Sequence, residues 1–262
     1  MSSSLSTISA LVNTMIGGTM LTIPMLFREA GIGYGLVILF FSGLISYKTC
    51  ELYVIHMSEK ENSIEETIRR ILGVRWEILF KKITGFYLVC LNAIYIDLIV
   101  DQCYNILYFV FKETGHGKWV ADKDVDHLVF DKFSVQYLSI FMFLPIFRMT
   151  LITNFRILLK LTSLGVLAVI IYILFISYEF SSAFSSIPFD KIPLFGNSVG
   201  NLLGTCAIAF TIHTVVNPII KANLNQKNNL RDLRISYFLG FLIYASIGVF
   251  GCLSVLGNSS LI

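Results

Sequence analysis

The fold is decided by residues 5–27, LSTISALVNTMIGGTMLTIPMLF, a long apolar segment that two adjacent glycines divide. The segment is long enough to cross a bilayer, since about 20 apolar residues span the hydrocarbon. Gly17 and Gly18 interrupt it midway, and Pro24 follows. In lipid every backbone N–H and C=O needs a partner, so such an interruption is tolerated only inside protein or beside a watery cavity. We therefore predict a broken membrane helix.

A second segment, far along the chain, has the same design. Residues 200–220, GNLLGTCAIAFTIHTVVNPII, are apolar, with Gly204 early and Asn217-Pro218 late. The pattern predicts that a second membrane helix is interrupted at these residues. Matched interruptions in two hydrophobic segments are the best indication, within a sequence, of the substrate site of a secondary transporter.

The composition is that of an integral membrane protein. The mean hydropathy is +0.74, and only 14% of the residues are charged, whereas soluble domains have roughly 25%. This composition excludes nucleic-acid binding. The first apolar stretch lacks the basic start of a signal peptide, so we expect it to remain as a membrane helix. The sequence has no nucleophile–base pair, phosphate loop or zinc spacing, and we therefore expect neither an enzyme nor a metal site.

Apolar segments of membrane-spanning length recur about seven times along the chain. They lie at about 5–27, 33–55, 84–111, 134–152, 157–178, 200–220 and 235–256. They are rich in Leu, Ile and Phe and lack the alternation of barrel strands. The sequence therefore predicts an all-α, multi-pass membrane protein.

Basic residues are unevenly divided between the loops. The loops after the second, fourth and sixth segments hold thirteen Lys and Arg, and the opposite loops hold six. Because cytoplasmic loops carry the excess of Lys and Arg, we predict a cytoplasmic N-terminus. In the first of the basic loops, Ser63 and Glu66 form a capping box before apolar residues at helical spacing, and Gly73 follows. A short amphipathic helix is expected there, on the cytoplasmic face.

Several motifs appear in a fixed order over nearly the whole chain. The longest is N-T-M-I-G-G-T-M-L-T-I-P-M-L-F-R-E-A-G at residues 13–31. The others are A-F-x-x-H at 209–213, N-N-L-R-D-L-R-I-S-Y at 228–237, L-T-S-L-G-V-L-A at 161–168 and Y-x5-D at 95–101. Together they resemble the amino acid/auxin permease family, in particular its lysosomal and sodium-coupled neutral amino acid transporter branch.

The resemblance implies a LeuT-like bundle of two inverted five-helix repeats. Residues 1–178 would form the first repeat and residues 200–262 the start of the second, within one partial transporter domain over 1–262. Such transporters have about eleven helices, so the bundle is expected to be incomplete, with about seven. We expect a C-terminal half or a partner subunit to close the cavity, and the 262 residues alone not to transport.

The resemblance also places the substrate site at the two broken helices. The new N-terminus at a break exposes N–H groups and positive dipole density, which suit a carboxylate. The preceding C-terminal end offers carbonyls to a cation or an ammonium group. The predicted substrate-binding residues are Asn13, Thr14, Gly17, Gly18, Thr19, Ala207, Ile208, Ala209 and Phe210. The alternative is that the glycines only allow close helix packing.

Three titratable residues within apolar spans are candidates for ion or proton coupling: Asp97, Asp101 and His213. An intramembrane carboxylate costs on the order of 3 kcal/mol, and a second one nearby pushes one pKa upward. Histidine titrates near neutral pH. The alternatives are an Asp101 that is solvated at the far-side mouth and a His213 that only bonds a carbonyl. Na⁺ or H⁺ is the expected coupling ion, with no other cofactor.

We therefore expect secondary active transport of amino acids across the lipid bilayer, by alternating access around the two broken helices. The alternative is a relative that does not transport, either an amino-acid sensor or a structural subunit of a membrane complex. The vacuolar or lysosomal membrane and the plasma membrane both remain open as the location. The sequence does not name the amino acid.

Overall fold

The computed structural model describes residues 4–58, 60–115, 132–151, 155–187 and 192–259, and within these ranges its regular elements are all helices. Two compact units can be distinguished. The first unit comprises Met1–Glu77 and Leu159–Ile262, and the second comprises Ile78–Leu158. The prediction of an all-helical membrane protein is confirmed.

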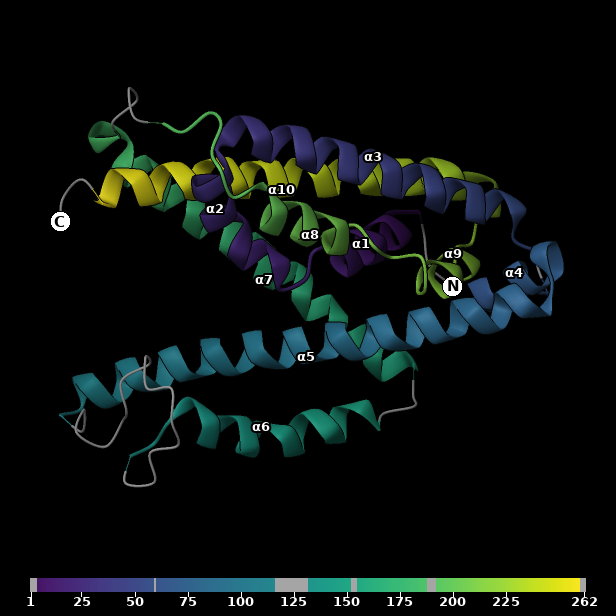
Figure 1. Cartoon of the computed structure of the whole chain (residues 1–262), viewed down its shortest axis with the longest axis horizontal. Helices are drawn as coiled ribbons and strands as arrows, with labels where there is room; N and C mark the ends of the chain where they lie inside the picture. The colour runs from purple at the N-terminus through teal and green to yellow at the C-terminus, as the bar shows by residue number, and fades with distance from the viewer. Residues whose placement is uncertain (1–3, 59, 116–131, 152–154, 188–191, 260–262) are drawn as a thin grey trace. The chain divides into compact units, whose positions relative to one another are not determined.

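The first unit contains both predicted broken helices, and Figure 1 labels its elements. Its helices are α1 (Ser4–Met15), α2 (Thr19–Ala30), α3 (Ile32–His56), α4 (Ile64–Leu72), most of α7 (Phe155–Ala183), α8 (Val199–Ala209), α9 (Val216–Lys221) and α10 (Asn229–Ser259). Among the described residues, the 3₁₀ turns η2 (Phe184–Ser186) and η4 (Gln226–Asn228) lie between these helices. The long α10 packs against α1, α2 and α3, while α8 packs against α2 and α3.

Small residues allow the close approach of α2, α3 and α10. The Phe27 ring of α2 is fully buried. A Cβ at Gly35 of α3 would lie 2.8 Å from this ring, and one at Gly248 of α10 would lie 2.7 Å from it. Close packing through small residues is typical of membrane helices, where the hydrophobic effect does not drive association.

One end of the first unit is closed by backbone hydrogen bonds between distant segments. Ile32 N donates to Pro193 O at 2.8 Å, and Gly196 N donates to Ala30 O at 2.7 Å. Between α2 and α3, Gly31 has a φ of 90°, which only glycine adopts without strain. The segment that leads into α8 is thereby fixed against the turn between α2 and α3.

The other end carries the predicted amphipathic helix, α4. The Ser63 side chain accepts a hydrogen bond from Glu66 N at 3.4 Å, and Gly73, with a φ of 93°, ends the helix. The capping box is not reciprocal, because the Glu66 carboxylate accepts from Asn62 N instead of Ser63 N. The short helix and its two ends are otherwise as predicted.

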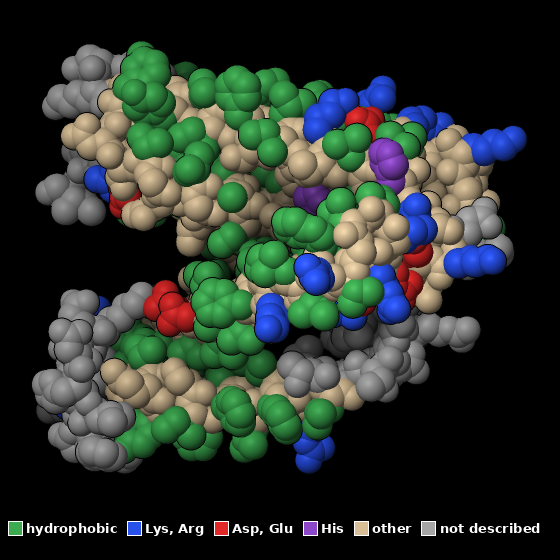
Figure 2. All heavy atoms as spheres, turned by 45° about the vertical axis from the view of Figure 1, so that its right-hand side comes forward, with side chains coloured by type: hydrophobic (Ala, Val, Ile, Leu, Met, Phe, Trp, Pro, Cys, Tyr) green, Lys and Arg blue, Asp and Glu red, His purple; other side chains and the backbone are tan. Residues whose placement is uncertain are grey.

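The loop before α4 is fastened to α9. The Glu61 carbonyl accepts hydrogen bonds from the Asn217 side chain, at 3.1 Å, and from the Lys221 ammonium group. The Glu61 carboxylate is buried and bonds Arg70 and Thr67. Two of the basic loops that the charge pattern predicts on one side of the membrane are therefore in contact. On the face drawn in Figure 2, many of the Lys and Arg side chains lie toward the right, and hydrophobic side chains are spread over the upper left part.

The second unit is built from α5 (Val74–Glu113), which it contains from Ile78 onward, and α6 (Val135–Thr150). Its small core includes the buried Val100, Tyr104 and Leu138. The Tyr104 ring stacks on Phe133 with 6.2 Å between ring centroids. Lys118, Lys123 and Lys191, three of the basic residues counted on the predicted far side, lie outside the described residues.

The membrane crossings agree in part with the prediction. Four described helices are long and apolar enough to span a bilayer: Ile32–His56, Val74–Glu113, Gly165–Ser186 and Gln226–Gly257. The bent pair of α1 and α2 would make a fifth. Shorter apolar helices, Val135–Arg148 and Val199–Ala209, correspond to the predicted crossings at 134–152 and 200–220. The count of seven and the LeuT-like arrangement of two repeats therefore stay predictions.

Candidate substrate site at the two helix breaks

The first helix breaks where the sequence predicts. Helix α1 ends at Met15, α2 begins at Thr19, and the two axes are bent by 56°. Within the break, Gly17 N donates to Met15 O at 3.1 Å. Gly18 has a φ of −57° and a ψ of −20°, angles that any residue adopts. The absence of a side chain at Gly18 therefore provides space more than conformational freedom.

A tyrosine of α10 holds this first break. The Tyr244 hydroxyl donates to Met15 O at 2.8 Å, and Thr19 Oγ1 lies 2.7 Å from Tyr244 Oη. Because the single phenolic proton is directed at Met15 O, Thr19 must be the donor to Tyr244. Thr19 and Tyr244 are both buried, so these bonds satisfy polar groups that water does not reach.

The second helix breaks elsewhere than predicted. The interruption comprises residues 210–215, between α8 and α9, whereas Gly204 lies inside α8 and Asn217-Pro218 lies inside α9. The prediction of the break at these residues was wrong for a physical reason. Pro218 is the third residue of α9, and a first-turn N–H has no partner within its helix, so proline is tolerated there.

A second tyrosine of α10 holds this break. The Tyr237 hydroxyl donates to Phe210 O at 3.1 Å, and the Ser46 hydroxyl of α3 donates to the same oxygen at 2.6 Å. Both lone pairs of the Phe210 carbonyl are thus occupied. The Phe210 ring is fully buried. It stacks on Tyr237 at 6.2 Å and meets Tyr244 edge-on at 5.6 Å.

The two tyrosines therefore connect the breaks. Tyr237 and Tyr244 are seven residues apart on α10, which is close to two helical turns and places them on one face. The sequence prediction missed both. The sequence feature that could have indicated them is two tyrosines seven residues apart within an apolar span, because a hydroxyl without a hydrogen-bond partner is costly there.

The remaining residues predicted from the first helix lie on α1. Asn13 is half-buried and faces α7, since a Cβ at Gly165 would approach its Oδ1. Thr14 is exposed, and its hydroxyl donates to Ala10 O at 2.7 Å. Gly17 and Gly18 are half-buried in the break. The structure therefore brings Thr19 and both glycines to the break and directs Asn13 toward α7.

The residues predicted from the second helix divide between two faces of α8. Ala209 and Phe210 are buried at the break. Ile208 is half-buried, and Ala207 is exposed. Ala207 lines a cavity of about 280 Å³ whose wall comprises Ser42, Ile45, Ser46, Thr49, Leu203, Ala207, Thr211 and His213. This cavity adjoins the second break, because Ser46 bonds the Phe210 carbonyl.

The candidate coupling residues are in separate units. His213 lies within the second break, and its Nε2 is 2.8 Å from Thr49 Oγ1 of α3. Asp97 and Asp101 lie on the part of α5 that belongs to the second unit, with Asp97 exposed and Asp101 half-buried. Their role in coupling stays a prediction.

Electrostatics at the breaks come from the backbone. None of the nine predicted substrate-binding residues has a charged side chain. At the N-terminus of α2, Met20 N donates to Gly17 O at 3.2 Å and Leu21 N donates to Gly18 O at 3.1 Å, and the helix dipole contributes positive charge density. The arrangement suits a small ligand that carries its own carboxylate and ammonium groups.

A family model described as "Transmembrane amino acid transporter protein" matches residues 1–255. The chain belongs to this family. The family assignment suggested by the sequence motifs is thus confirmed. Together with the apolar helices it makes the chain a multi-pass membrane protein.

The chain is similar to curated relatives named "Neutral amino acid transporter 9". It is 26% identical to the one from Danio rerio over 94% of this chain and 53% of that protein. It is 24% identical to those of Xenopus tropicalis and Rattus norvegicus, again over 94% of this chain, and over 53% and 52% of those proteins. The chain spans about half the length of the curated relatives that it matches.

Proposed function

We propose that the chain takes part in secondary active transport of amino acids, by alternating access around the two helix breaks. One observation carries the proposal. The first interrupted helix, α1 and α2, packs against α10, and two tyrosines of α10 hold the breaks: Tyr244 bonds the Met15 carbonyl at the first and Tyr237 bonds the Phe210 carbonyl at the second. The family membership supports the same function.

The chemistry of the breaks favours a neutral amino acid. The N-terminus of α2 would receive the carboxylate, with Gly17 and Gly18 leaving room for it. Carbonyls at the end of α8 would receive the ammonium group. The nine predicted substrate-binding residues are uncharged, which suits a substrate without an acidic or basic side chain, and the relatives are named neutral amino acid transporters.

Alternating access requires parts that move against each other. The first unit contains both breaks with α3 and α10, and the second contains α6 and most of α5. We propose that these groups are the moving parts. His213, Asp97 and Asp101 are the residues proposed for coupling to Na⁺ or H⁺, as the sequence predicts. A cytoplasmic N-terminus accords with the hydrogen bonds from α9 to the Glu61 carbonyl, which join two basic loops at one end.

Binding of neutral amino acids by Gly17→Leu tests the site. The isobutyl group would fill the space beside the N-terminus of α2, so we expect saturable binding of radiolabelled neutral amino acids to be abolished while membrane insertion is retained. Gly204→Leu is the matched control, because a Cβ at Gly204 meets no atom within 4 Å.

Two outcomes separate the possibilities. Unchanged affinity in Gly17→Leu would remove the site from the first break. Saturable uptake of a neutral amino acid into vesicles by the wild-type chain alone would contradict the expectation that a C-terminal half or a partner subunit is needed for transport, and would exclude the alternative of an amino-acid sensor or a structural subunit.

A further inference from the structure

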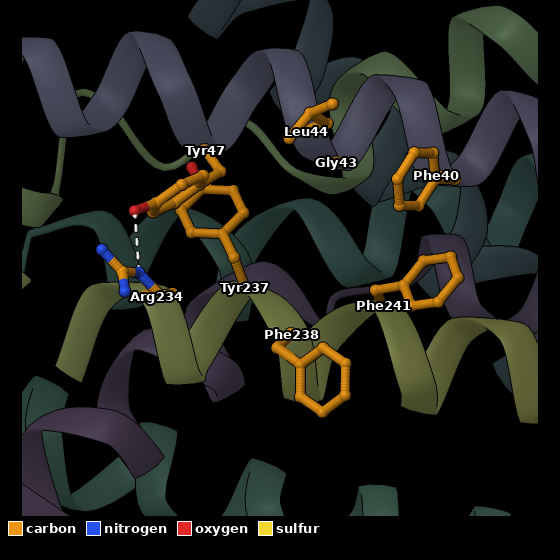
Figure 3. Close-up of a pocket in the computed structure, with 8 residues that line it drawn as sticks. All are labelled: Phe40, Gly43, Leu44, Tyr47, Arg234, Tyr237, Phe238 and Phe241. Atoms are coloured by element: carbon orange, nitrogen blue, oxygen red, sulfur yellow. Dashed lines mark hydrogen bonds between the residues drawn. The ribbon is translucent and has the colours of Figure 1, made fainter. Parts of the chain in front are cut away.

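An apolar groove of about 200 Å³ lies between α3 and α10. Figure 3 shows its aromatic walls, with Phe40 from α3 opposite Phe238 and Phe241 from α10. Phe40 and Phe238 remain 50% and 59% exposed. In a membrane protein, such a concave apolar surface is filled by a lipid chain or by another protein surface.

One end of the groove is polar. Arg234 and Tyr47 line it there, and Arg234 Nε donates to Tyr47 Oη at 3.3 Å. Arg234 and Phe241 are seven residues apart on α10, so the groove extends for roughly 10 Å along the helix from this end. It therefore has the polarity of a lipid, with one charged end followed by an apolar path.

The charges around the polar end are arranged to attract anions. The side chains of Lys48, Arg231 and Arg234 are 61%, 57% and 71% exposed. Their acidic neighbours are withdrawn, with Glu51 15% exposed and Asp232 fully buried. The surface that a headgroup would meet is therefore cationic, although the three basic side chains have two carboxylates beside them.

We propose that this groove binds an anionic glycerophospholipid from the leaflet on the side of the basic loops. One acyl chain lies between Phe40 and Phe238, and the phosphate is bound by Arg234, whose planar guanidinium suits phosphate oxygens. Juxtamembrane Lys and Arg attract anionic lipids in the same way.

The lipid would contact a residue that holds the second helix break. The Tyr237 ring lines the groove, and its hydroxyl bonds Phe210 O. An acyl chain packed against this ring favours the rotamer in which the hydroxyl reaches the break. Occupation of the groove is therefore expected to stabilise the second break, whatever the transported substrate.

A tryptophan reporter tests the proposal. Phe238→Trp, in a background of Trp76→Phe and Trp119→Phe, places the one tryptophan of the full chain in the groove, and it is excited at a wavelength that the twelve tyrosines do not absorb. The protein is reconstituted in phosphatidylcholine with dibrominated phosphatidylserine or dibrominated phosphatidylcholine, and quenching is measured. We expect phosphatidylserine to be preferred by about fivefold, the effect typical of one basic residue near the surface, and the preference to fall with salt.

Two matched variants and a second reporter test whether Arg234 and the groove cause the preference for phosphatidylserine. Arg234→Gln should reduce the preference to near one, whereas Lys227→Gln, which removes one positive charge at an exposed residue outside the groove, should retain it. A reporter at Leu167→Trp, exposed on α7, should show no preference. Equal quenching by both lipids at the groove would overturn the proposal. An absence of quenching would also overturn it, because protein would then cover the groove.

Discussion

The two helix breaks differ in how they are made. The first comprises three residues, 16–18, and includes two adjacent glycines. The second comprises six residues, 210–215, none of them a glycine. The Met15 carbonyl is satisfied by a neighbouring N–H and one hydroxyl, whereas the Phe210 carbonyl is satisfied by hydroxyls from two other helices.

The difference separates local from tertiary causes. At the first break the sequence itself ends the helix, and Tyr244 satisfies the carbonyl that is left. At the second break, capture of the Phe210 carbonyl by Ser46 and Tyr237 is what replaces the helical hydrogen bond. We infer that the second break depends more on its surroundings, and that it is better protected against the loss of a single donor.

Removal of single hydroxyls from α10 has the largest effect and tests this comparison. Tyr244→Phe leaves the Thr19 hydroxyl without its acceptor and Met15 O with only the Gly17 N–H of the break. We expect a loss of roughly 2 kcal/mol in the free energy of unfolding, the cost of unsatisfied buried polar groups. Tyr237→Phe should cost about 1 kcal/mol or less, since Ser46 still donates to Phe210 O.

Thermal unfolding of both variants in the same detergent measures the difference. Tyr34→Phe, on an exposed residue of α3, is the control and should leave the midpoint unchanged. A larger loss for Tyr237→Phe than for Tyr244→Phe would contradict the comparison. If the comparison holds, the double variant Ser46→Ala with Tyr237→Phe loses more unfolding free energy than the sum of the losses of the two single variants, because no hydroxyl then donates to Phe210 O.

A smaller effect on stability is expected at the loop before α4, whose Glu61 carbonyl is hydrogen-bonded to α9. The Arg70 guanidinium, with Ser58 N and Thr67, lowers the pKa of the Glu61 carboxyl to about 2. Because the folded pKa lies below the unfolded one, this contribution is fully present above about pH 5 and is lost as the pH falls toward 2. The stability of Glu61→Gln should therefore vary less than that of the wild type over this window. An equal change of stability with pH in the two proteins would contradict this prediction.

Much of the fold could be predicted because apolar length and glycine position are local signals. The first break, the α4 helix between Ser63 and Gly73, and the all-helical membrane class follow from them. The position of the second break could not be predicted, because Ser46 and Tyr237 lie far away in the sequence. Pro218 misled the prediction, since a proline both ends helices and begins them.

The candidate site shows the same limit. Gly17, Gly18, Thr19 and Phe210 are predicted from the sequence as substrate-binding residues, and they lie at or beside the helix breaks, while their role in binding stays a prediction. Tyr244 was missed because a tyrosine in an apolar span also occurs simply as a core residue. The exposure of Ala207 could not be predicted either, because an apolar helix such as α8 has no polar face to indicate which side packs against α2.

Protection of the first break by ligand tests the central claim most directly. Gly18→Cys is introduced into the chain with its five native cysteines replaced, and its rate of reaction with a water-soluble thiol reagent is measured in vesicles with and without neutral amino acids. We predict that a saturating amino acid slows labelling at residue 18 severalfold and leaves Gly204→Cys unaffected, because only the first lies at the N-terminus of α2. A substrate site at the break would be contradicted if no amino acid slowed labelling at residue 18, or if the reagent did not label residue 18 at all.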